Sequence, residues 1–278
     1  MAVCGRARRR MGSRLVQLNR LMARAGLCSR READQLVKSG RVLVDGAPAI
    51  LTQRYPPEVK IEIQEDAAAE AKLSIMMHKP VGLLSQSSDP LPHQRFAIDL
   101  CTWDTWRGTD YEARQMKSGA LPPARMPKMA CAGRLDMDSS GLVIFTQDGV
   151  LARELVGGHE QGQIMPEKEY EVKVSDAVGR PLRDAAKQRE VARRLSHGLH
   201  LDGQALRPCR VEWLQPGSML RMVLTQGRKR QIRRMLELLR LECVSLHRTR
   251  IGALRLGGLP CGQWRFVERL DVLGAVGR

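Results

Sequence analysis

The segment GRLDMDSSGLVIFTQDG, residues 133–149, joins a polar loop to a strongly apolar run. Leu142 to Phe145 predict a buried strand, because a short apolar run bounded by glycine and polar residues is typical of a sheet core. Asp136 lies in the loop just before this strand, where a carboxylate can act as a nucleophile or a general base. A structural role, as the cap of a turn or the partner of Arg134, fits the spacing at least as well.

The residues around this segment predict an α+β domain. Strands are expected at 73–77, 142–146, 170–174 and 220–225, and helices at 150–156, 182–195 and 231–239. These elements interleave without the regular βαβ rhythm of a parallel fold, so we expect a mixed, largely antiparallel α/β arrangement. The stretch from Gln86 to Ala130 contains prolines and isolated aromatic residues, and it predicts an irregular loop.

A smaller unit precedes this domain. A first helix is indicated by apolar residues at helical spacing: Leu15, Leu18, Leu21, Met22 and Ala25. Ser29 and Glu32 predict a capping box that starts a second helix. Asp45-Gly46 predicts a tight hairpin, and residues 59–63 predict a further strand. The expected organisation is a disordered basic tail at 1–14, this unit at 15–64, a linker at 65–72 and the larger domain at 73–270.

The charge of the chain favours nucleic acid as its partner. Lys and Arg number 46 against 30 Asp and Glu, which gives a net charge of +16 and a pI near 10.2. Such a surplus attracts polyanions, and no apolar run approaches the roughly 20 residues of a membrane-spanning helix. Several of the basic residues fall on or beside the two expected N-terminal helices: Arg20, Arg24, Arg30, Arg31, Lys38 and Arg41. They indicate either a phosphate-binding face or a solvated helix face.

Three further segments carry residues suited to RNA chemistry. In QGRKRQIRRMLELL, residues 226–239, Arg230, Arg233 and Arg234 share one sector of a helix and can bind phosphate or a carboxylate. In HKPVGLLS, residues 78–85, Lys79 lies in a rigid turn that we expect near the surface, as a phosphate contact. In EKEYEVKV, residues 167–174, alternation places Tyr170 on the inward face, as core or as a platform for a base.

Several cofactor classes have no motif in the chain. The seven cysteines are dispersed and form no CxxC pair, so the sequence predicts reduced thiols rather than a zinc ribbon or a disulfide framework. The sequence also contains no P-loop and no GxGxxG fingerprint. We therefore expect a reaction without nucleotide, metal or other cofactor, in a cytoplasmic setting.

Two resemblances bring these segments together. RLMARAGLCSRREADQLVKSGRVLVDG, residues 20–46, resembles the alpha-L RNA-binding domain. The larger domain resembles the small-subunit-type (RsuA-like) family of bacterial ribosomal RNA pseudouridine synthases. Four segments in order carry that likeness: GRLDMDSSGL, EKEYEV, GRKRQIRRM and LHRTRIGALRLGGLPCGQWR.

The resemblance implies roles for individual residues. Asp136 matches the essential aspartate, Arg233 the arginine that pairs with it, and Tyr170 the tyrosine that stacks on the target base. Contacts to RNA are expected from Lys79, Arg134 and Arg230 near the site, and from Arg20, Arg24, Arg30 and Arg31 in the N-terminal unit.

The resemblance also implies a substrate. The expected substrate is a uridine of ribosomal RNA, with a slight preference for the large subunit, in free RNA or in a pre-ribosomal particle. Two alternatives stay open: a synthase acting on transfer RNA, and a non-catalytic RNA-binding factor for ribosome assembly. A monomer is the default expectation for the oligomeric state.

Overall fold

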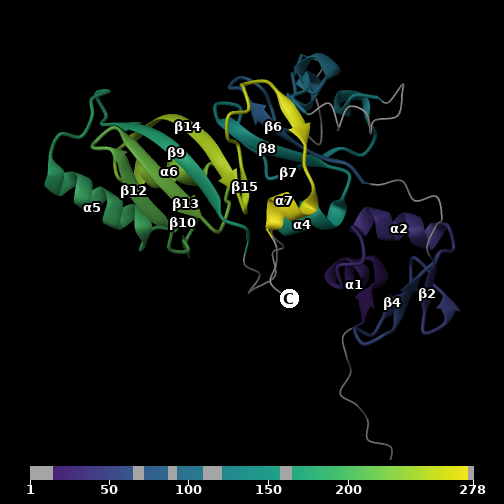
Figure 1. Ribbon diagram of the computed structural model, residues 1–278. Coiled ribbons are helices and arrows are strands. Elements are labelled where there is room, and N and C mark those ends of the chain that lie inside the picture. The colour runs from purple at the N-terminus through teal and green to yellow at the C-terminus, as the bar shows by residue number, and fades with distance from the viewer. Residues whose placement is uncertain (1–14, 65–71, 87–92, 109–120, 157–164, 275–278) are drawn as a thin grey trace, which may run out of the picture. The chain divides into compact units, whose positions relative to one another are not determined.

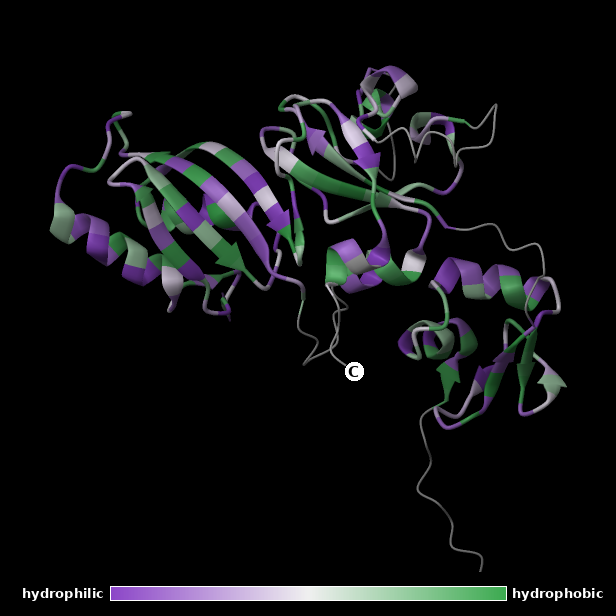
Figure 2. Cartoon of the chain, in the orientation of Figure 1, coloured by the Kyte–Doolittle hydropathy of each residue, from purple (hydrophilic) through white to green (hydrophobic). Residues whose placement is uncertain are grey.

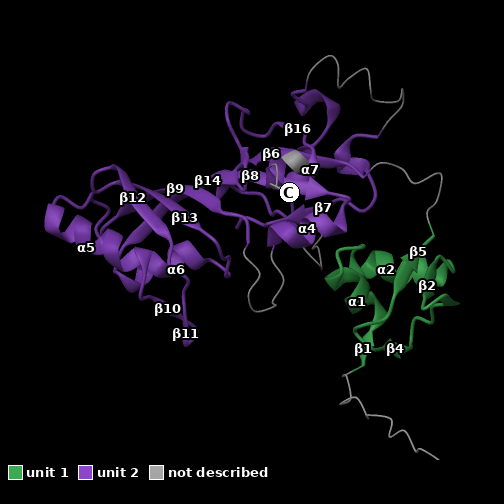
Figure 3. Cartoon of the chain, turned by 60° about the horizontal axis from the view of Figure 1, so that its bottom comes forward, with its two compact units in different colours: residues 1–71 green, residues 72–278 purple. Residues whose placement is uncertain are grey.

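The computed structural model describes residues 15–64, 72–86, 93–108, 121–156 and 165–274. The chain divides into two compact units, Met1–Ala71 and Lys72–Arg278 (Figure 1, Figure 3). The predicted tail at 1–14 lies outside the described residues, as does the predicted linker apart from Lys72. Parts of the predicted irregular stretch, 87–92 and 109–120, also lie outside them.

The first unit packs two helices against short antiparallel strands. The helices are α1 (Leu18–Arg24) and α2 (Arg30–Lys38); the strands are β1 (Val16–Gln17), paired with β4 (Arg54–Tyr55), and β2 (Val42–Val44), between β3 (Ala47–Pro48) and β5 (Ile61–Ile63). The predicted capping box is confirmed, because the Ser29 hydroxyl accepts from the Glu32 amide and the Ser29 amide donates to the Glu32 carboxylate. The predicted hairpin is also confirmed: Asp45 and Gly46 both have positive φ, as a type I′ turn requires.

The second unit is built on one mixed sheet. Its path runs β12 (Arg210–Gln215), β13 (Met219–Leu224), β9 (Lys168–Ser175), β14 (Glu242–Ile251), β8 (Ser140–Thr146), β6 (Ser74–Lys79) and β16 (Trp264–Phe266), with β15 (Leu254–Arg255) beside β14 and β7 (Ala130–Ala132) beside β8. Every pairing in this sheet is antiparallel except the one between β14 and β8. The expectation of a mixed, largely antiparallel domain is therefore confirmed.

Helices flank this sheet. They are α4 (Gly149–Val156), α5 (Ala185–Ser196), α6 (Gln231–Leu238) and α7 (Arg269–Leu273), with 3-10 turns at Ala97–Leu100, Trp103–Thr105 and Pro123–Arg125 and a small hairpin of β10 (His200–Leu201) and β11 (Gln204–Ala205). The helix expected from Leu182 begins three residues later, because the Asp184 carboxylate caps it by accepting from the Ala186 amide. Leu182 still packs in the core, as an irregular residue before the helix.

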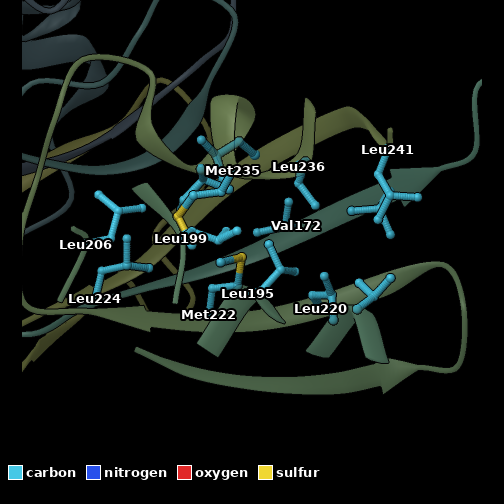
Figure 4. Close-up of a cluster of buried hydrophobic side chains, with 14 of the residues drawn as sticks. Val172, Leu195, Leu199, Leu206, Leu220, Met222, Leu224, Met235, Leu236 and Leu241 are labelled. Atoms are coloured by element: carbon cyan, nitrogen blue, oxygen red, sulfur yellow. The ribbon is translucent and has the colours of Figure 1, made fainter. Parts of the chain in front are cut away.

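Along β9 and β13, apolar side chains alternate with polar ones and direct one face of the sheet to a core (Figure 2). Strands β6 and β8 are instead buried almost throughout and pack apolar side chains on both faces. In one cluster, Met235 and Leu236 of α6 lie against Val172, Leu220 and Met222 of the sheet (Figure 4). All five side chains are buried. This packing fixes α6 on the sheet, and with it the arginines at its N-terminal end.

Candidate active site

A pocket of about 690 Å³ lies in the second unit, between the loop before β8 and the loop before α6. Four residues singled out from the sequence line it: Arg134, Asp136, Tyr170 and Arg230. Lys79 and Arg233 do not line it. The structure thus brings together side chains that are up to 96 residues apart in the chain, counting from Arg134 to Arg230 (230 − 134).

Gly141 sets the position of the Asp136 loop. Its φ is +110°, and a Cβ there would overlap the backbone of Arg248. Only glycine tolerates both the conformation and the close approach. The approach is needed because β8 pairs in parallel with β14 here, with Gly141 opposite Arg248.

Backbone and hydroxyl contacts fix the rest of this loop. The Ser85 hydroxyl donates to the Leu135 carbonyl at 2.7 Å and accepts from the Leu135 amide at 2.9 Å. The Gly82 amide donates to the Met137 carbonyl at 2.8 Å. Asp136, between the two anchored residues, is half-buried, and its carboxylate forms no hydrogen bond or ion pair with any residue that the structure describes. The carboxylate is therefore free to act on a bound substrate.

Arg233 does not pair with Asp136, contrary to what the resemblance implies. Its Nη2 lies 3.2 Å from the carboxylate of Asp138, and it also donates to the Asp138 carbonyl at 2.9 Å and to the Ser139 hydroxyl at 3.3 Å. Arg230 adds a two-pronged contact to the same carboxylate, at 3.2 Å from both guanidinium nitrogens. Arg233 is 7% exposed, so it acts as a buried anchor of the loop that carries Asp136.

Lys79 is not the surface phosphate contact that we expected. The side chain is fully buried, and its Nζ donates to the carbonyls of Pro80 and Ser139, both at 2.8 Å. Burial lowers the pKa of Lys79 to about 8, although the negative charges of Asp138 and Asp136 act in the opposite direction. The reason is topological: Lys79 ends β6 opposite Gly141 of β8, so its side chain runs beneath the loop.

Tyr170 lies on β9 with its ring in the pocket wall. The predicted alternation is confirmed, because Val172 and Val174 are buried whereas Lys173 is exposed. The ring packs partly against two hydrophobic clusters, and its remaining surface faces the pocket. A half-buried aromatic ring in such a wall can stack on a nucleobase.

Two buried basic residues of the pocket, Arg248 and Lys168, were not predicted as site residues from the sequence. Arg248 is 1% exposed and donates from Nε to the Leu142 carbonyl at 2.7 Å and from Nη2 to the Gly133 carbonyl at 2.5 Å. Lys168 is 4% exposed, and burial, followed by the charge of Arg248, lowers its pKa to about 8. A signal for Lys168 was present, because it precedes Tyr170 by two residues and shares its strand face. Arg248 lies in a segment that mixes apolar and polar residues, so the local sequence does not indicate that it is buried.

The remaining predicted contacts belong to the first unit. Arg20, Arg24, Arg30 and Arg31 are exposed on α1 and α2 of the first unit, as a phosphate-binding face requires. In the second unit, Arg234 binds the carboxylate of Asp202 at 2.6 Å. Within the described ranges, no cluster of His, Cys, Asp and Glu could hold a metal ion. None of the described helices is long and apolar enough to cross a membrane.

Comparisons with known proteins agree with this arrangement. The RNA pseudouridylate synthase family matches residues 73–238, and the S4 domain matches residues 16–49. The chain is 31% identical over 255 residues to the dual-specificity RNA pseudouridine synthase RluF of Escherichia coli K12, covering 90% of this chain and 74% of the relative. It is 32% identical over 262 residues to ribosomal large subunit pseudouridine synthase B of Salmonella typhi, and the match covers 89% of this chain and 78% of that relative.

A solved structure described as a pseudouridylate synthase shares the fold. Its TM-score is 0.55 at 21% identity, and the match covers 92% of this chain and 98% of that one. The family match spans more than half of the chain, from β6 to the end of α6, and includes the loop of Asp136 and the strand of Tyr170. The chain is therefore an RNA pseudouridine synthase of the RsuA-like branch of the RNA pseudouridylate synthase family, with an N-terminal S4 domain.

Proposed function

We propose that this protein isomerises a uridine of ribosomal RNA to pseudouridine, with Asp136 as the catalytic carboxylate. The observation that carries the proposal is the position of Asp136: a half-buried carboxylate without a partner among the described residues, in a pocket shared with the ring of Tyr170. The loop on both sides of it is anchored by Ser85, Arg233 and Lys79. A carboxylate held in this way needs no rearrangement to meet a flipped nucleotide.

The reaction needs no second substrate. The C1′–N1 bond breaks, the uracil turns, and its C5 bonds to C1′; C5 then releases its proton and N1 takes one up. Asp136 either attacks C1′ or removes the C2′ proton, and both choices leave the ring able to rejoin the sugar. No atom of the RNA other than this exchanged proton is lost, so we propose a mechanism without a cofactor.

Exposed arginines that line the pocket can bind the phosphates of a bound RNA strand. Arg134 and Arg230 line the pocket and are exposed, which allows them to contact the strand on either side of a flipped nucleotide. We propose large-subunit RNA, free or in a pre-ribosomal particle, because one similar relative carries that subunit in its name. We further propose a cytoplasmic location, consistent with the free thiols of the six cysteines that the structure describes.

The test uses unmodified small- and large-subunit ribosomal RNA and transfer RNA, incubated with the full chain without any cofactor. Pseudouridines are mapped by carbodiimide modification and primer-extension stops, with Asp136→Asn as the matched variant. We expect one new stop in large-subunit RNA that the variant does not produce. Stops only in transfer RNA would change the substrate. No stop in any RNA, despite salt-sensitive binding, would favour a binding factor, and wild-type turnover by Asp136→Asn would refute the catalytic assignment.

A further inference from the structure

The floor of the pocket contains two buried cations without an acidic partner. The Nζ of Lys168 makes a single long hydrogen bond, 3.4 Å to the Pro166 carbonyl, and forms no ion pair with a described residue. Among the described residues, the hydrogen bonds of Arg248 go to two backbone carbonyls, those of Leu142 and Gly133. Burying a cation without a counter-charge costs free energy, so such a pair is retained where a ligand supplies negative charge.

The strand register places Lys168 and Arg248 beside the ring of Tyr170, which is the proposed platform for the target base. Lys168 precedes Tyr170 by two residues on β9, so the two side chains lie on the same face of the sheet. Arg248 is the direct partner of Tyr170 across β14, and its guanidinium carbon lies 6.0 Å from the centre of the tyrosine ring. A bulge in β14 follows directly after Arg248.

The two cations converge near Gly133. A Cβ at Gly133 would lie 3.9 Å from Nη1 of Arg248 and 4.0 Å from Cε of Lys168. Gly133 is three residues before Asp136 in the same loop. The cations therefore lie between the base platform and the loop that carries the reacting carboxylate, in the wall of one pocket.

The depth of these cations selects the anion that can reach them. A phosphodiester remains tied to the RNA strand on both sides, and exposed cations such as Arg134 and Arg230 already serve it. The uracil is the part of a flipped nucleotide that enters deepest. It also becomes negatively charged: when C1′–N1 breaks, the bonding electron pair passes to N1 and spreads over O2 and O4.

We propose that Lys168 and Arg248 form a uracil subsite, in which Lys168 donates a hydrogen bond to a carbonyl oxygen of the target base and both cations stabilise the uracil anion. This proposal rests on the proposed function and deepens it. The negative charge leaves Asp136 when its carboxylate bonds to C1′ or takes the C2′ proton, and it moves onto the uracil. The uracil loses this negative charge when C5 bonds to C1′. Release of the C5 proton and protonation of N1 then complete the product. The subsite serves either role of Asp136.

The test compares Lys168→Met with Lys168→Arg and with Lys173→Met, an equal loss of charge on the exposed face of the same strand. Single-turnover rates are measured at saturating enzyme on transcribed large-subunit RNA, together with RNA affinity. We expect Lys168→Met to react roughly 100-fold more slowly, as for the loss of one donor to a developing anion. Its RNA affinity should stay unchanged, Lys168→Arg should recover part of the rate, and Lys173→Met should match the wild type.

A second substrate separates chemistry from structure. In RNA carrying 5-fluorouridine, the fluorine withdraws electrons and stabilises the uracil anion, so cleavage depends less on Lys168. Loss of 5-fluorouridine from nuclease digests, measured by mass spectrometry, should therefore show a much smaller difference between Lys168→Met and wild type. An equal factor on both RNAs would indicate a purely structural role and overturn the proposal.

Other outcomes are equally decisive. A wild-type rate for Lys168→Met, or a loss confined to RNA affinity, would refute the uracil subsite. If the wild type itself makes no pseudouridine, the proposed function fails rather than this inference alone. Thermal denaturation checks folding, and Lys168→Gln replaces Lys168→Met in every comparison if the methionine variant does not fold.

Discussion

At the scale of single residues, Gly141 is a position at which the backbone leaves no room for a side chain. We expect Gly141→Ala to lower the free energy of unfolding by more than about 3 kcal/mol, because a positive φ is strained and the new Cβ overlaps the Arg248 backbone. Chemical denaturation measures the change. Gly258→Ala is the matched control, since a Cβ at Gly258 meets nothing within 4 Å. Equal stability of the two variants would contradict the close approach of β8 and β14.

Lys168 should weaken the fold while it serves the site. Its pKa falls from the usual 10.5 to about 8 through burial, and then through the charge of Arg248. Between pH 8 and pH 10.5, Lys168 binds more protons in the unfolded chain than in the folded one. The contribution of Lys168 to the free energy of unfolding therefore rises with pH in this range. Below pH 8 the buried charge costs roughly 3 kcal/mol, a cost that Lys168→Met removes.

The pH dependence of this effect can be measured. The Tm of Lys168→Met should exceed that of wild type most clearly below pH 8. The difference should shrink as the pH rises towards 10.5, where the lysine is neutral in both states. Lys173→Met, exposed on the same strand, should show no such trend. A constant difference across this range would mean that burial does not shift the pKa of Lys168.

At the scale of elements, α6 holds the catalytic loop through Arg233. We expect Arg233→Met to lower the single-turnover rate at saturating RNA by about 100-fold, because a displacement of roughly 1 Å in the Asp136 loop has that effect. Arg234, on the same helix, binds Asp202 instead of the Asp136 loop, so Arg234→Met should react at nearly the wild-type rate. An unchanged rate in Arg233→Met would show that Lys79 and Ser85 suffice to position the loop.

The local pattern predicted α6 well, but it missed strand β14 (Glu242–Ile251) and misplaced the start of α5. Residues 231–239 were predicted as a helix from Ile232, Met235 and Leu236, and α6 is found at Gln231–Leu238. The start of α5 was placed too early, because the apolar Leu182 continues the periodicity although Asp184 caps the helix. Apolar spacing records which side chains are buried, whereas a cap depends on one hydrogen bond.

At the scale of the whole molecule, two units share the task of binding RNA. We expect Arg30→Ala with Arg31→Ala to weaken RNA binding and to reduce the slope of log affinity against log salt by about 1.5, since each lost phosphate contact accounts for roughly 0.7–0.9. The rate at saturating RNA should not change, because these exposed residues belong to the first unit and the pocket to the second.

A matched control removes equal charge elsewhere in the first unit. Arg54→Ala with Lys60→Ala alters exposed side chains on or beside its strands rather than its helices. We expect filter binding at several salt concentrations to show little change for this pair. The same loss of affinity in both double variants would mean that the total charge of the unit matters and that the helix face does not.

The sequence by itself determined the kind of domains, the family and four pocket residues. Periodicity predicted β6, β8, β9 and β13 but not β14, the strand that carries Arg248. Arg134, Asp136, Tyr170 and Arg230 all line the pocket. These properties are local, because a motif and its flanking hydropathy lie within about ten residues.

Only the tertiary structure decided how the cations are used. It placed Lys79 beneath the Asp136 loop, moved the ion pair of Arg233 to Asp138, and buried Lys168 and Arg248 in the pocket floor. A lysine or arginine in a sequence shows its charge but not its burial or its partner. Both follow from the pairing of strands that are far apart in the chain, such as β8 with β14, and that pairing depends on long-range packing.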